Sequence, residues 1–176
     1  MQIANMWMKP AVSPDASGIP DQSESTALVA DQIIKNHVIV AMATGLIPLP
    51  LIFDMVAVTG IEVHMIAALA KAYSFPIPRG HVLGKVLISI AGGIAPGYLS
   101  VKFADLLKGL PLAGQAVYLG TLSIAGGAAV YAVGKVFQEH FESGGTFLSL
   151  DNSTIRSFFK TKQKEGKALI PMLVKG

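Results

Sequence analysis

The chain has 176 residues, of which 52% are hydrophobic and 14% are charged. A soluble globular domain typically carries about 25% charged residues, so the deficit indicates that much of this chain avoids water. The formal net charge of +3 is too small and too scattered to indicate nucleic-acid binding. Cysteine is absent, which excludes a disulfide framework and a thiolate metal site.

The N-terminal segment, residues 1–24, is polar and is interrupted by Pro10, Pro14 and Pro20. This composition predicts a flexible arm. The segment holds no apolar run of signal-peptide length, so we expect no cleavable signal. An internal segment would then direct the chain into a membrane.

A first helix is predicted over residues 27–45, and its second half is apolar. Ser25 or Thr26 can cap its N-terminus, because a hydroxyl oxygen accepts a hydrogen bond from a free backbone amide there. Pro48 and Pro50 end the helix, since proline lacks the amide donor and clashes with the preceding turn.

A second helix is predicted over residues 51–73. Its polar residues include Asp54, Glu62 and His64, and at 100° per residue they spread around the axis. A helix without one polar face is expected to be buried against partners on most sides. Glu62 and His64 are two positions apart and face different sides, so we expect polar contacts inside a bundle, or a wet crevice, rather than a metal site or acid–base catalysis.

A third helix is predicted over residues 81–107. It has no charged residue between Lys85 and Lys102, and Gly92, Gly93, Pro96 and Gly97 interrupt it. A break of this kind is tolerated in a membrane where the backbone is enclosed by protein, so a re-entrant turn is expected there.

The fourth helix follows from the run 109–134, which contains no charged residue. Its 26 residues exceed the roughly 20 that cross a hydrocarbon core, although a buried helix of a soluble bundle is the alternative. The expected helix continues to residue 143, where two glycines supply a stop. Small residues at spacings of four predict close helix–helix packing. They are Ala116, Gly120, Ser123, Gly127, Ala128 and Ala132.

The C-terminal tail, residues 146–176, is basic. Asp151, Asn152 or Ser153 can cap a short helix that carries Ile155, Phe158 and Phe159 on one side. Its basic residues are candidates for contact with a partner or with anionic lipid headgroups, where each contributes on the order of 1 kcal/mol; a solvated arm is the alternative. These residues are Arg156, Lys160, Lys162, Lys164 and Lys167.

The distribution of basic residues also predicts an orientation. Seven basic residues follow Gly134, whereas the link before the fourth helix carries only Lys102 and Lys108. Basic residues near a span favour the cytoplasmic side. We therefore expect a cytoplasmic C-terminus in a bacterial inner membrane, with the last turns of the fourth helix, around Lys135 and Glu142, projecting into water.

Several motifs resemble the YcjF-like domain, a bacterial domain of unknown function. They are Ile-Pro-Leu-Pro at 47–50 with Asp54, Val-His-Met at 63–65, Gly-Lys at 84–85, Gly-Leu-Pro at 109–111 and the stretch 131–145. The resemblance covers residues 35–148 and implies an inner-membrane domain that often follows an Era-like small GTPase domain. The chain has no phosphate-binding Gly-Lys-Ser/Thr loop, so GTP hydrolysis is not expected here, and the family offers no catalytic residues to carry over.

Together these patterns predict an all-α, membrane-embedded bundle of about four main helices, plus a short basic C-terminal helix. The expected organisation is a flexible arm (1–24), a helical membrane domain (25–145) and a basic tail (146–176).

For function, we expect no enzyme activity, cofactor or bound metal. The leading hypothesis is a membrane-anchored accessory or scaffold protein that works with a separately encoded partner such as a GTPase. The alternative is a channel or transporter-like protein that uses Asp54 and Glu62 and forms its pore as a homo-oligomer. A peripheral lipid-binding protein that never spans is a third reading.

Overall fold

The computed structural model describes residues 22–47, 51–77, 111–145 and 152–174, which form four helices. They are α1 (Gln22–Gly45), α2 (Leu51–Ala72), α5 (Leu112–Glu142) and α6 (Asn152–Val174). No strand occurs within these ranges, so the predicted all-α class is confirmed for the described part of the chain. The helix predicted over 81–107, with its glycine-rich break, lies outside the described residues.

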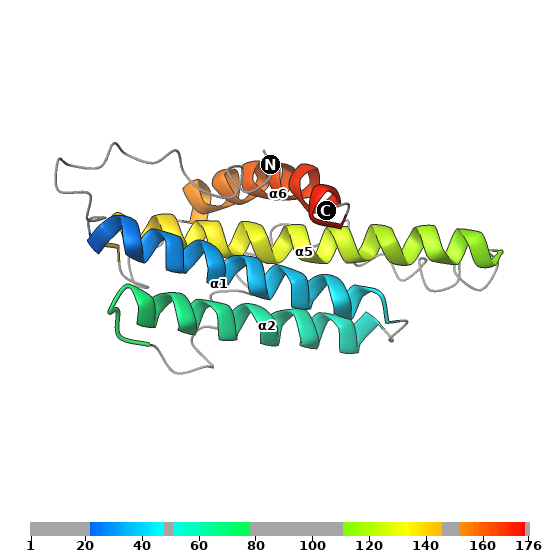
Figure 1. The fold of residues 1–176 in the computed structure, drawn as a ribbon, viewed down its shortest axis with the longest axis horizontal. Helices are drawn as coiled ribbons and strands as arrows, with labels where there is room; N and C mark the ends of the chain where they lie inside the picture. Colours follow the sequence, from blue (N-terminus) through cyan, green and yellow to red (C-terminus); the bar gives the residue numbers. More distant parts are fainter. Residues whose placement is uncertain (1–21, 48–50, 78–110, 146–151, 175–176) are drawn as a thin grey trace.

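The longest helix, α5, organises the others (Figure 1). It packs against α1, α2 and α6, and α1 also packs against α2. Along the long axis of the molecule, α1 and α2 run antiparallel beside α5, which extends past the tip of their hairpin at the end where Leu112 lies. α6 covers another side of α5 near its C-terminal half.

The N-terminus of α1 differs from the prediction. The helix begins at Gln22, so it starts five residues earlier than residue 27. Ser25 Oγ and Thr26 Oγ1 donate hydrogen bonds to the Gln22 carbonyl oxygen, at 2.9 and 2.8 Å. Both residues therefore lie within the first turns, where their hydroxyls bond back along the helix instead of capping it.

The core is centred on the C-terminal half of α5. Tyr131 and Phe137 are almost completely buried there, together with Ile34 from α1, Leu69 from α2 and Ile170 from α6. The buried surface therefore comes from all four helices, which is the arrangement expected of a bundle with one shared core.

The last turns of α5 are enclosed by the bundle. Phe141 is 3% exposed and stacks on Phe75 with ring centroids 5.0 Å apart, and Gln138 is 5% exposed. The expectation that these turns project into water is wrong for this face of the helix, because the other helices cover it. Glu139 and Glu142 lie on the exposed face.

The C-terminal helix is longer than expected. It was expected to be short, but α6 has 23 residues and includes Pro171 in its last turns. A proline near the end of a helix removes a single backbone hydrogen bond and need not stop it. Ile155, Phe159, Leu169 and Ile170 form the buried face of α6, which packs against α5.

Gly127 lies at a three-helix contact. A Cβ atom added there would lie 2.7 Å from Met42 Cγ on α1 and 3.0 Å from Ile170 Cδ1 on α6. At Gly120, on the same helix, an added Cβ would meet no atom of the described residues within 4 Å. The two glycines share a sequence pattern but have different surroundings.

These surroundings predict different effects of Gly127→Leu and Gly120→Leu. At Gly127 the side chain has to displace Met42 and Ile170, and overpacking of this kind typically costs about 1–3 kcal/mol. At Gly120 the same change should be neutral or slightly stabilising, because leucine favours helix more than glycine. Denaturant unfolding of the purified protein in mild detergent, followed by circular dichroism, measures both. Equal stability of the two variants would contradict the close contact at Gly127.

Candidate functional site

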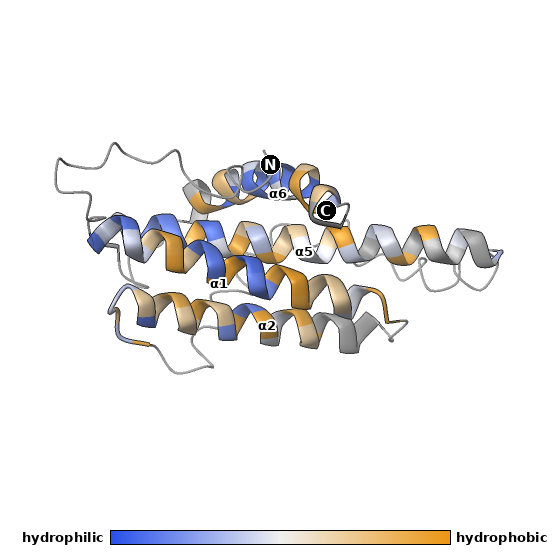
Figure 2. Ribbon diagram, viewed as in Figure 1, coloured by the Kyte–Doolittle hydropathy of each residue, from blue (hydrophilic) through white to orange (hydrophobic). Residues whose placement is uncertain are grey.

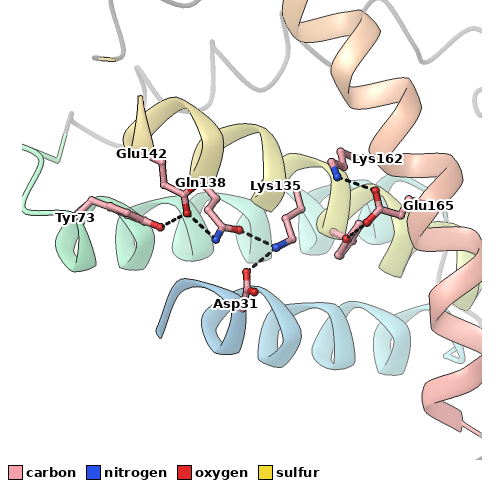
Figure 3. A network of polar contacts seen from close by, with 8 residues as sticks. Asp31, Tyr73, Lys135, Gln138, Glu142, Lys162 and Glu165 are labelled. Carbon is pink, nitrogen blue, oxygen red and sulfur yellow. Dashed lines mark hydrogen bonds and ion pairs between the residues drawn. The ribbon is translucent and has the colours of Figure 1, made fainter. Parts of the chain in front are cut away.

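A chain of polar contacts runs along the C-terminal half of α5 (Figure 3). Lys135 Nζ lies 2.6 Å from Asp31 Oδ1 on α1 and donates to Gln138 Oε1 at 2.9 Å. Gln138 Nε2 donates to Glu142 Oε1 at 3.1 Å. The hydroxyl of Tyr73, the residue that follows α2, donates to the same oxygen at 2.9 Å. Three segments of the chain are thereby joined through side chains of one helix.

A second group of contacts joins α5 to α6. The Tyr131 hydroxyl donates to Glu165 Oε1, and Lys162 Nζ lies against Glu165 Oε2, each at 2.7 Å. Burial alone would raise the pKa of Glu165, but the hydrogen bonds and the charges of Lys162 and Lys135 outweigh it and lower that pKa. Glu165 therefore stays ionised, and Lys162 is its partner within α6.

The Asp31–Lys135 pair is largely shielded from water. The two side chains are 11% and 15% exposed. Loss of one member of a shielded pair leaves the other charge without compensation, which costs far more than loss of an exposed pair. The geometry is that of a structural clamp between α1 and α5.

The predicted small-residue positions on α5 have several environments. Ser123 Oγ donates to the Met42 carbonyl oxygen on α1 at 2.7 Å. Ala128 and Ala132 are fully buried, and Gly127 and Gly120 have the contacts given above. The side chain of Ala116 lies outside what the structure describes.

The two polar candidates on α2 whose side chains the structure describes, Glu62 and His64, have different surroundings. Glu62 is 8% exposed, and burial raises its pKa to about 7. It therefore holds its proton in the fold well above the pH at which an unfolded glutamate loses it. His64 is exposed and contacts His37 of α1, and the side chain of Asp54 lies outside what the structure describes. No group of three or more metal-ligating side chains occurs among the described residues.

Four of the basic candidates on α6 remain on its outer face. Arg156, Lys160, Lys164 and Lys167 are exposed, whereas Lys162 is paired with Glu165. A row of exposed basic side chains on a helix whose other face is buried suits contact with anionic groups.

In the described helices, charged residues gather at one end of the bundle, and the other end is apolar. Met42 and Ile170 meet α5 at Gly127, while Ile34 and Met65 meet it at Gly134, so these contacts place the helices side by side at two levels. The apolar end is defined by residues 38–47, 51–61, 112–127 and 168–174, where Asp54 is the only residue with a charged side chain. Figure 2 shows the change along α1, from hydrophilic near Gln22 to hydrophobic near Gly45. Glu62 lies just outside the apolar end.

Large apolar side chains are exposed at this end. In all the described helices and the residues next to them, ten large apolar side chains are exposed. Seven of them belong to the apolar end: Ile39, Val40, Leu46, Ile47, Val56, Val117 and Met172. Exposed apolar surface concentrated in one region marks an interaction site for protein or membrane.

Magnetosome membrane protein 22 of Magnetospirillum gryphiswaldense is 36% identical to this chain over 159 residues, which cover 89% of this chain and 80% of the relative. The chain belongs to the family of that protein. No family model and no solved structure matches the chain. Membership in this family is thus established, whereas the YcjF-like resemblance is not.

The family relationship bears on α5. The stretch Leu119–Glu142 of α5 is long and apolar enough to cross a membrane. No other helix in the described part of the chain has such a stretch. A core helix of a soluble protein has the same length and composition, and 59% of the stretch is buried in the bundle. Hydropathy alone therefore does not decide how α5 lies relative to a bilayer, and the positions of the charged residues are needed as well.

We predict that Lys135→Ala lowers the free energy of unfolding by about 3 kcal/mol, because Asp31 is left shielded and unpaired. The double variant Asp31→Leu/Lys135→Met should recover most of this loss, since an apolar pair can replace a shielded ion pair. Lys162→Ala, which breaks the more exposed pair on α6, should cost less than about 1 kcal/mol. Equal losses of unfolding free energy from Lys135→Ala and Lys162→Ala would contradict the larger contribution of the shielded Asp31–Lys135 pair.

Proposed function

We propose that this protein is a non-catalytic membrane protein, anchored through its apolar end, that presents its polar end to a separately encoded protein partner. The proposal rests on one observation: the charge-poor parts of all four described helices lie at the same end. The name of the relative supports a membrane location, because that protein is a magnetosome membrane protein.

The lengths of the apolar segments suit an end-on insertion. The helical residues 38–45 and 51–61 measure about 12 and 16 Å at about 1.5 Å per residue, roughly half of the ~30 Å hydrocarbon core. The hairpin of α1 and α2 would therefore enter one leaflet. The part of α5 at the apolar end, residues 112–127, measures about 24 Å, so α5 would penetrate more deeply than its neighbours.

The polar end is suited to hold a partner outside the bilayer. The clamp between Asp31 and Lys135 and the contacts of Tyr73 and Glu165 fix this end, and Lys71 and Glu139 are exposed on it. The exposed basic residues of α6 would lie over anionic headgroups and favour a cytoplasmic position of this end. A GTPase is the partner class that the YcjF-like resemblance suggests.

The channel alternative has less support. A pore lined by Asp54 and Glu62 requires carboxyl groups that face a water-filled lumen. Glu62 is buried within its own chain, so it does not offer such a face in the single chain.

Two valines on α1 provide a matched test of the anchor. Val40 and Val29 are 51% and 52% exposed, and their spacing of eleven residues places them on nearly the same face. Val40 lies at the apolar end and Val29 at the polar end. We predict that Val40→Asp weakens flotation with anionic liposomes and increases release by carbonate, because a carboxylate is costly in hydrocarbon, whereas Val29→Asp behaves like the wild type. Identical behaviour of the two variants would contradict end-on insertion.

We further predict that the protein, isolated from its native membranes in mild detergent, retains a stoichiometric protein partner. Glu139→Lys, a charge reversal on the exposed polar end, should reduce that recovery, and Val29→Ala should leave it unchanged. If the partner is a GTPase, its retention should differ between GTP and GDP. Failure to recover any partner after mild cross-linking would count against the accessory role and leave the anchor itself intact.

A further inference from the structure

Two histidines from different helices meet at the contact between α1 and α2. His37 Nε2 lies 2.9 Å from His64 Nδ1, and the ring centroids are 5.2 Å apart. The chain has four histidines in total, so this pair brings together half of them. The contact belongs neither to the polar chain along α5 nor to the proposed anchor.

A backbone carbonyl fixes which ring nitrogen of neutral His37 carries the proton. Its Nδ1 lies 2.7 Å from the Ile33 carbonyl oxygen, and because a carbonyl can only accept, Nδ1 carries a proton and donates it. In the neutral ring Nε2 then has a free lone pair, and it faces His64. A histidine whose second nitrogen donates to a backbone carbonyl is the usual form of a metal-binding histidine.

The pair is also open to water. His64 is exposed and His37 is half-buried, so an ion can reach both rings from the solvent. Met65 and Ile34, their near neighbours in sequence, meet at Gly134, which places the histidines close to the border of the apolar end. Without an ion, the His64 Nδ1 proton forms a hydrogen bond to His37 Nε2.

We propose that His37 Nε2 and His64 Nδ1 form a two-histidine site for a divalent transition-metal ion, Cu²⁺ or Ni²⁺, which links α1 to α2. Two nitrogens about 2.1 Å from one ion lie about 3.0 Å apart at a 90° angle and about 3.4 Å apart at a tetrahedral angle. The observed 2.9 Å is the length of the hydrogen bond, so the two rings have to turn toward the ion but the nitrogens hardly have to separate for a 90° angle, as in square-planar and octahedral ions. Water completes the coordination, and the His64 proton moves from Nδ1 to Nε2 when the ion binds.

The site is tested on the full chain in detergent, purified without a histidine tag and titrated with CuCl₂ or NiCl₂. Calorimetry measures affinity, and pulsed electron paramagnetic resonance of the Cu²⁺ form counts the imidazole nitrogens. The variants are His37→Ala and His64→Ala, with the double variant His81→Gln/His140→Gln as the control. Circular dichroism verifies that each variant is folded, and exposed His64 is the substitution least able to disturb packing.

We expect one ion per chain and two imidazole nitrogens in the wild type and in the control. Each alanine variant should show one nitrogen and bind Cu²⁺ about tenfold or more weakly, because one of two nitrogen ligands is lost. Binding should weaken in acid, since protonated imidazole cannot coordinate. No binding by the wild type, equal binding by the alanine variants, or loss of binding in the control would overturn the proposal.

Discussion

The close packing of the neighbouring helices against the glycines of α5 is the constraint from which the arrangement of the described helices follows. The ion pair between Lys135 and Asp31 lies in the same register of α1 against α5, where the charge-free run 109–134 ends. With that register Ile34 meets Gly134 and Met42 meets Gly127. The apolar half of α1 is thereby held beside the apolar half of α5, and the division of the bundle into two ends follows.

Much of the fold could be predicted, because it depends on local signals. Pro48 and Pro50 separate α1 from α2, and the uncharged run of α5 ends at a positively charged residue. The length of α6 was missed, although Ile155, Phe159, Gly166 and Ile170 recur at spacings of four, seven and four, which is the signal of a packed helix. Gly166 confirms close packing, since an added Cβ would lie 3.2 Å from the Ala128 Cα.

The contacts between helices could not be predicted in the same way. Asp31 and Lys135 are 104 positions apart, and His37 and His64 are 27 apart. Their pairing depends on the rotation of each helix about its axis, which the whole core determines and no short motif encodes. For the same reason Gly120 and Gly127, alike in sequence, differ in their surroundings. The relative is a magnetosome membrane protein. The apolar end of the bundle provides a physical reason for the membrane location that its name states.

The claim that the apolar end of the bundle lies in a bilayer while the polar end lies outside it has a direct test. Because the chain has no cysteine, single cysteines carrying spin labels can be placed at Val56, Val117, Lys71 and Glu139 in protein reconstituted into lipid vesicles. The account predicts that labels at Val56 and Val117 are accessible to oxygen in the hydrocarbon and shielded from a water-soluble nickel chelate. Labels at Lys71 and Glu139 should show the opposite preference. Equal access of the chelate to all four positions would contradict the account.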